Sequence, residues 1–346
     1  MGEVRFCKAG VTKVWMMGRC FVWNFLGVPN FFSEGGREIF FVIGGLIFEK
    51  LGCLILVSLY MHTLPPPKRI SARFKDYNRD MKDVWSSFIF IDFYTDKVRA
   101  KVKKDEIEPF LLESLSGKSK RTHEKNKVDT YGVADHIAKV VNPERSFITA
   151  VALTEDFLKD IMVTVYEEYP EKMLSTEALE SIDRQYKLLD TILAKATKEE
   201  IVASLIEEKV RGIFYGNPID YFTKDKKTKL GFGNYFEKNH SLNLKYFAEI
   251  TARRNLFAHN RGRVDAKYLR EVENPTLKAG QKAVIEKEYL RHTIIILRGL
   301  ASVAAMLVNT NIFKETHAHG TMKPVVEAFE KHYNDSIPPA KRAFSC

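Results

Sequence analysis

Cysteine is scarce in this sequence. Only four occur in 346 residues (Cys7, Cys20, Cys53 and Cys346), and none lies between residues 54 and 345. This number excludes the disulfide framework of a small secreted domain. No Cys-x2-Cys pair or Cys/His grouping has the spacing of zinc ligands, so we expect neither a metal nor a cofactor. A reducing, cytoplasmic location fits best.

A surface that is basic throughout is also absent. Residues 1–142 contain 23 Lys and Arg against 16 Asp and Glu, whereas the remaining 204 residues contain 31 against 28. The C-terminal part is therefore close to neutral, and any phosphate-binding site there must come from a local cluster. Hydrophobic residues make up 45% and charged residues 28% of the chain, which excludes disorder throughout.

Residues 1–65 form an apolar extension unlike the rest. Two apolar runs, 39–48 and 51–61, are separated only by Glu49 and Lys50. One helix over 39–61 would be about 34 Å long, enough to cross a bilayer. Three interpretations compete. The first is a membrane anchor over 38–62, which the central charges oppose. The second is a cleaved secretory signal, and the third is an extension upstream of a later start at Met61 or Met81.

A proline run at 65–67 marks a boundary, and residues 66–142 then form a basic segment of mixed character. Its apolar run 84–94 predicts a strand, and 106–115 predicts a short helix. The lysine-rich stretch 117–127 predicts a solvated loop, with contact to nucleic acid as the alternative. The role of this segment is not assigned.

From residue 143 to 315 the pattern is helical. Asn142 is the expected N-cap of a helix that ends before Pro170, and its apolar face recurs at spacings of three, four and seven. A second helix is expected over 176–195. Thr197, with Glu200 in a capping box, begins a third that Gly216 terminates. The core face of the first helix comprises Phe147, Val151, Leu158, Ile161 and Val165, and that of the third comprises Ile201, Leu205, Val210 and Ile213.

Two further helices complete the expected domain. Ser241 begins the fourth, which ends near Gly262, and the last covers about 286–312. The last is apolar almost all round, so we expect it to be the buried central helix. The fold class is therefore all-α, a helical bundle preceded by the small mixed segment and the apolar extension, with 316–346 as a tail.

The fourth helix contains Arg254-Asn255-Leu256-Phe257-Ala258-His259-Asn260-Arg261-Gly262. This stretch resembles the arginine–polar–three residues–histidine signature of HEPN proteins. The Arg-Asn dipeptide, the His-Asn-x-Gly end, a short following helix over 264–269 and an apolar final helix all contribute. The resemblance covers about 143–315 and implies a metal-independent endoribonuclease.

The residues suit that chemistry. Asn255 and His259 are four apart and share a helix face, while Arg254 lies about 140° from His259 around the axis. Histidine moves protons near neutral pH, and arginine offers permanently charged planar donors for phosphate. The resemblance implies that His259 acts as general base or acid and that Arg254 stabilises the phosphorane. It further implies that Asn255 orients the phosphate or the imidazole. Attack by a ribose 2′-hydroxyl selects RNA over DNA.

A local basic cluster could receive RNA phosphates, although solvated helix ends often look alike. Its candidate members are Arg253, Asn260, Arg261, Arg263 and Lys267. Arg261 stands where family members controlled by a nucleotidyltransferase often carry tyrosine, so regulation of that kind is not supported. No second catalytic domain is evident in 66–142.

The resemblance also implies a homodimer. Two copies of the motif helix would face each other, and Leu256 and Phe257 are expected to be exposed and to need covering. A role as a toxin or in antiviral defence, held in check by an inhibitor or antitoxin, is expected. The alternative is a helical dimerisation or RNA-binding module that does not cleave.

Overall fold

A computed structural model describes residues 14–17, 20–23, 64–106, 110–113, 122–173, 195, 197–273, 275–315 and 320–335. The chain divides into two compact units, Met1–Pro65 and Pro66–Cys346. In the first unit, β1 (Val14–Met17) pairs antiparallel with β2 (Cys20–Trp23). The helix considered over 39–61, including the possible start at Met61, lies outside the described residues.

The described part of the second unit is mostly helical, so the expected all-α class is confirmed at that level. Its elements are α2 (Pro66–Lys103), β3 (Phe110–Glu113), β4 (Thr122–Lys125), α3 (Lys127–His136), the π-helix η1 (Ile137–Val141), α4 (Asn142–Glu168), η2 (Pro170–Lys172), α7 (Lys198–Phe214), α8 (Asp220–Thr223), α9 (Asp225–Thr228), α10 (Tyr235–Asn239), α11 (Ser241–Asn260), α12 (Ala266–Glu271), α13 (Lys287–Asn311) and α14 (Met322–Tyr333).

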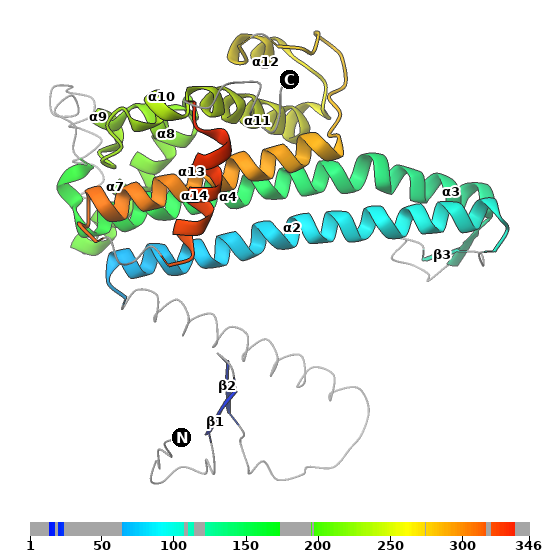
Figure 1. Ribbon diagram of the computed structural model, residues 1–346, viewed down its shortest axis with the longest axis horizontal. Helices are drawn as coiled ribbons and strands as arrows, with labels where there is room; N and C mark the ends of the chain where they lie inside the picture. The colour runs from blue at the N-terminus through cyan, green and yellow to red at the C-terminus, as the bar shows by residue number, and fades with distance from the viewer. Residues whose placement is uncertain are drawn as a thin grey trace. The chain divides into compact units, whose positions relative to one another are not determined.

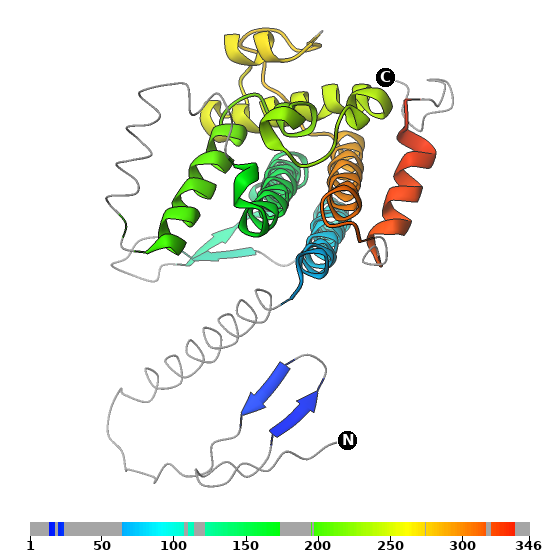
Figure 2. The same cartoon turned by 90° about the vertical axis from the view of Figure 1, so that its left-hand side faces the viewer.

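Three long helices, α2, α4 and α13, lie side by side and contain most of the core (Figure 1). Viewed nearly end-on, α11 crosses over α4 and α13, and α14 flanks α13 (Figure 2). The expected central helix is confirmed, because α13 is buried along most of its length from Leu290 to Asn309. In the described part of the chain, α13 alone is long and apolar enough to span a membrane. Of its most apolar window, 72% is buried in this unit, as in a core helix.

The strand expected over 84–94 is wrong, because these residues belong to the 38-residue helix α2. Met81 and Phe88 are buried and Val84 and Trp85 pack against the same core, which is a helical spacing of three and four. The apolar run looked strand-like because exposed aromatic residues (Phe90, Phe93 and Tyr94) extend it beyond these core positions. Tertiary packing has therefore overridden the β preference of the run.

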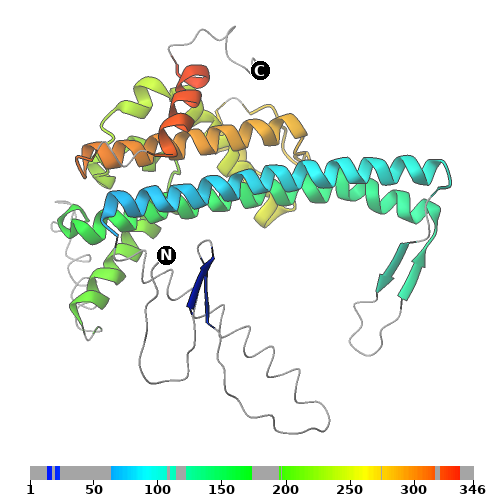
Figure 3. The same cartoon turned by 60° about the horizontal axis from the view of Figure 1, so that its bottom comes forward.

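The prediction of a short helix over 106–115 is also wrong, because the described residues 110–113 form a strand. Strand β3 pairs antiparallel with β4, with Phe110 opposite Lys125 and Glu113 opposite Thr122. This hairpin connects the far ends of α2 and α3 (Figure 3). Within the lysine-rich stretch expected to be a loop, 117–127, residues 122–125 form β4 and Lys127 begins α3, and 117–121 lies outside the described residues.

The boundary expected between residues 142 and 143 falls within continuous helix. Chain from α3 runs through η1 directly into α4, and α2 shares one core with α4. Asn142 is not an N-cap: it is buried, and its Nδ2 donates to the Phe88 carbonyl at 3.0 Å. Pro143 has no N–H and would clash with the carbonyl four residues earlier. The wider π-turn at η1 lets the helix continue past it.

Several helical expectations are confirmed. The face of α4 from Phe147 to Val165 is buried as expected, and the helix ends at Glu168 before Pro170. Thr197 caps α7, accepting from the Glu200 N–H at 3.2 Å. On α7 the buried residues are Ile206, Val210 and Ile213, whereas Ile201 and Leu205 are only half-buried. The second helix, expected over 176–195, lies almost wholly in undescribed residues.

The expected tail contains a packed helix. Phe329 of α14 lies against Gly299 of α13, and Tyr333 is also buried. Buried His240 stacks on Phe329 at 5.2 Å, and its Nε2 lies 2.9 Å from Glu330 Oε1. Because Asn243 Nδ2 donates to His240 Nδ1, the proton of His240 sits on Nε2 and is donated to Glu330. Helix α14 thus completes the core.

Replacing Gly299 with alanine should destabilise the second unit. A Cβ there would overlap the ring of Phe329, which must shift, so we expect the free energy of unfolding to fall by about 1–3 kcal/mol. Chemical denaturation of the full chain measures this change. Gly212→Ala in α7 is the matched control, because its Cβ meets no atom within 4 Å, and it should stabilise by roughly 0.5–1 kcal/mol. Equal effects at both positions would contradict the packing of α14.

Candidate active site

Helix α11 presents the motif at its C-terminal end. Its inner face packs on the core through Leu244, Phe247 and Ile250. It ends as expected, where Arg261 (φ 49°) and Gly262 (φ 75°) turn left-handed and the Gly262 N–H donates to the Leu256 carbonyl at 2.9 Å. A Cβ at residue 262 would overlap the ring of Phe257, so glycine is required both for its conformation and for this close approach.

The three expected catalytic residues lie on the last two turns of α11. The side chain of His259 is exposed and makes no hydrogen bond or ion pair within the described part of the chain. Asn255, one turn earlier on the same face, is half-buried. The structure therefore leaves His259 free to meet a solute, with an amide close behind it on the helix surface.

Arg254 is anchored on a neighbouring helix. Its Nη2 forms an ion pair with Glu155 Oε1 of α4, and the two side chains are 25% and 17% exposed. The Nε of Arg254 is buried and has no hydrogen-bond partner among the described residues. An unsatisfied buried donor costs free energy, so the guanidinium is held by Glu155 but incompletely hydrogen-bonded.

Arg253, expected among the RNA-binding residues, faces the protein interior instead. Its Nε donates to Glu249 at 2.6 Å, its guanidinium lies 4.1 Å from the ring centre of Tyr289, and Nη1 donates to the Val284 carbonyl. Burial opposes the charged form, yet Tyr289 and Glu249 outweigh it and raise the pKa of Arg253 above its usual value. Arg253 is therefore a structural cation that RNA cannot readily reach.

The same carboxylate joins three helices. Glu249 accepts hydrogen bonds from the hydroxyls of Tyr268 in α12 at 2.8 Å and Tyr289 in α13 at 2.5 Å. Burial, with the charge of Glu249, raises the pKa of both tyrosines far above neutrality, so both remain donors. The network fixes α12 over the end of α11.

The remaining expected RNA-binding residues follow the helix end. Asn260 Nδ2 donates to the Arg263 carbonyl at 2.6 Å, so Asn260 closes the turn. Arg261 and Arg263 are exposed, and Arg263 donates to the Gly280 carbonyl at 3.4 Å. Lys267 lies 3.9 Å from Glu271 on α12. These three basic residues lie on the surface beyond His259.

Leu256 and Phe257 were expected to be exposed, and this is wrong. Leu256 is buried in a second small core with Val264 and Tyr268. Phe257 packs edge-on against Phe147 of α4 at 6.0 Å. The chain itself covers both side chains, so they give no reason for a second copy to bind the motif helix.

The short helix expected after the motif is present as α12. Asp265 is its N-cap and accepts from the Tyr268 N–H at 2.8 Å. Glu155 and Glu249, the two acids that hold the adjacent arginines, were not identified from the sequence. Each acts through a tertiary or helix-turn contact, and neither belongs to a recognisable motif.

Comparison of the chain with family models, curated proteins and solved structures finds no match. The described residues contain no grouping of three or more histidine, cysteine, aspartate or glutamate side chains that could hold a metal ion.

Alanine substitutions at Arg253 and Arg270 should have very different effects on the free energy of unfolding, because only Arg253 is buried. Arg253→Ala leaves the Glu249 carboxylate without its cation, so we expect a loss of about 3–5 kcal/mol in the free energy of unfolding. Arg270→Ala, on the exposed side of α12, should change it by no more than about 0.5 kcal/mol. Denaturant unfolding followed by circular dichroism measures both. A stable Arg253→Ala protein would show that the Glu249 network does not hold α12.

Proposed function

We propose that this chain is a HEPN-type endoribonuclease that cleaves RNA without a metal. One observation carries the proposal. The Arg-Asn-x3-His signature occupies the C-terminal end of α11, with His259 open to solvent and Arg254, five residues earlier, paired with Glu155 of α4. A helical bundle with a buried apolar final helix is the setting that the resemblance implies.

The chemistry is a transesterification. A 2′-hydroxyl attacks the adjacent phosphorus, the bond to the 5′-oxygen breaks, and the products are a 2′,3′-cyclic phosphate and a 5′-hydroxyl. His259 takes the proton from the nucleophile or gives one to the leaving oxygen. Arg254 stabilises the additional negative charge on the phosphorane, and Asn255 orients the phosphate or the imidazole. No step requires a metal.

The contact between Glu155 and Arg254 supports a phosphate site and also constrains it. A phosphate oxygen that draws the guanidinium outward would give the unsatisfied Nε an acceptor. Glu155 then orients Arg254 from behind. Beyond the helix end, Asn260, Arg261, Arg263 and Lys267 provide the surface along which the RNA backbone lies.

The same ion pair favours a second candidate function. An arginine already neutralised by Glu155 would suit a module that keeps the fold and binds RNA or a partner without cleaving. Cleavage with an intact His259 distinguishes the two. The cellular role that fits the enzyme is that of a cytoplasmic toxin or defence protein restrained by an inhibitor.

Removing His259 tests the enzyme. The full chain with EDTA should nick total RNA and leave 2′,3′-cyclic phosphate ends. His259→Ala should lower the rate by roughly 10²–10⁴-fold, because a general acid–base group is lost. His332→Ala, which removes an exposed histidine of α14, should leave the rate unchanged. If a folded His259→Ala protein still cleaves RNA at the wild-type rate, His259 is not the acid or base of the reaction.

A composite site, built from the motif helices of two chains, is the arrangement that the resemblance implies. If one site takes His259 from one chain and Arg254 from the other, mixing Arg254→Ala protein with His259→Ala protein should recover part of the activity that each lacks. The recovery is measured as the amount of 2′,3′-cyclic phosphate ends formed by each variant alone and by the mixture. Activity that stays absent in mixtures, while the wild-type chain is active, would place a complete site in each chain.

A further inference from the structure

The outward face of α2 has an ordered sequence of charges. Positions 80, 83, 87, 90, 94, 97 and 101 alternate in spacing between three and four, the spacing of a helix–helix seam. The first of these residues are acidic (Asp80, Asp83), the middle ones aromatic (Phe90, Tyr94) and the last basic (Lys97, Lys101). We call this set the α2 stripe.

The middle of the α2 stripe is unusually apolar for a surface. Phe90 is 62% and Tyr94 51% exposed, and their ring centres are 4.5 Å apart. Neighbouring Phe93 and Ile91 are exposed as well. Contiguous exposed aromatic side chains commonly mark a binding surface.

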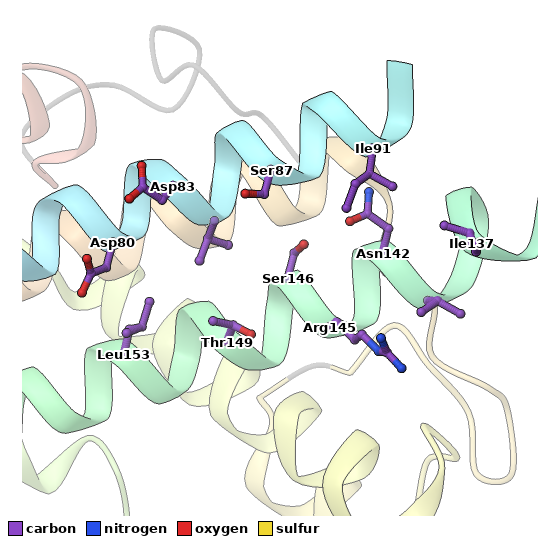
Figure 4. Close-up of a pocket in the computed structure, with 12 residues that line it drawn as sticks. Asp80, Asp83, Ser87, Ile91, Ile137, Asn142, Arg145, Ser146, Thr149 and Leu153 are labelled. Carbon is purple, nitrogen blue, oxygen red and sulfur yellow. The ribbon is translucent and has the colours of Figure 1, made fainter. Parts of the chain in front are cut away.

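An open groove runs beside the α2 stripe, between α2 and α4 (Figure 4). Its volume is about 650 Å³. Val84 and Ile91 of α2 line it together with Val141 and Leu153, and Asp80 and Asp83 lie at one end. The groove and the projecting aromatic side chains therefore both adjoin the α2 stripe.

We propose that this face binds a second copy of the chain, with the two α2 helices antiparallel. A face that is complementary to a second copy of itself makes an isologous contact, which closes after two chains. The order of charges fits this symmetry. With residue 92 at the two-fold axis, Phe90 faces the partner's Tyr94 and Asp83 faces the partner's Lys101.

Asp80 is already paired with Arg79, but Asp83 and Lys101 are available for such a contact. Neither Asp83 nor Lys101 forms an ion pair within the described part of the chain, and both are exposed. Parallel pairing would bring acid against acid and base against base, which costs free energy. The α2 stripe includes no residue of α11, so this inference is independent of the proposed ribonuclease.

Charge reversal tests the register directly. Sedimentation velocity of the full chain should show self-association at micromolar concentration. Asp83→Lys and Lys101→Asp should each weaken it by about tenfold or more, because each sets like charges opposite one another twice. The double variant Asp83→Lys/Lys101→Asp should regain wild-type association. Lys82→Asp, which reverses an exposed charge of α2 off the seam, should have little effect.

Three results would overturn the proposal. The first is a wild-type chain that stays monomeric, which is the result expected if residues 39–61 or a lipid surface cover the α2 stripe. The second is a single charge reversal that leaves self-association intact. The third is a double variant in which the two losses of association add. Circular dichroism of each variant confirms that the helices remain folded. Restoration in the double variant supports the antiparallel register, because neither an unrelated partner nor the chain's own N-terminal part would require the two reversals to compensate.

Discussion

The second unit depends on the enclosure of α13. From Leu290 to Asn309 this helix leaves almost no face for water, so other elements must surround it. Small residues such as Gly299 and Ala304 allow close approach, and Phe329 of α14 lies directly on Gly299. Arg298 is the exception in the middle of the helix. Burial lowers the pKa of Arg298, and its guanidinium donates to Asn78 of α2 at 2.7 Å. The arrangement of α2, α4, α11 and α14 follows from covering one apolar helix.

The packing of α11 around α13 also determines which way the neighbouring arginines of the motif helix point. Adjacent residues on a helix point about 100° apart, so Arg253 and Arg254 cannot share a neighbour. Arg253 turns toward Tyr289 of α13 and is held by Glu249, while Arg254 turns toward Glu155 of α4. Two neighbouring arginines thus have separate tasks. One secures the helix to the core, and the other is left at the edge of the bundle, near solvent.

The sequence predicted what depends on local pattern. The buried face of α4, the Thr197 cap of α7, the end of α11 at Gly262 and the burial of α13 all follow from spacing and capping chemistry within single segments. It failed where tertiary packing decides. Exposed Phe90 made a helix resemble a strand, and α14 was taken for a tail because its docking partner lies far away in sequence. Glu155 is 99 residues from Arg254, so no spacing could connect them.

The Glu155–Arg254 contact is where fold and proposed chemistry meet. In the free protein a carboxylate of α4 occupies one edge of the guanidinium, the kind of group that an RNA phosphate would otherwise contact. Five N–H donors allow arginine to serve two anions, one behind and one in front. Since Nε is buried and has no acceptor in the part of the chain that the structure describes, the side chain has donor capacity remaining. On the proposed function, RNA binding therefore adds an anion to an arginine whose direction α4 has already fixed, and the rigid α4–α11 packing determines where the phosphate must lie relative to His259.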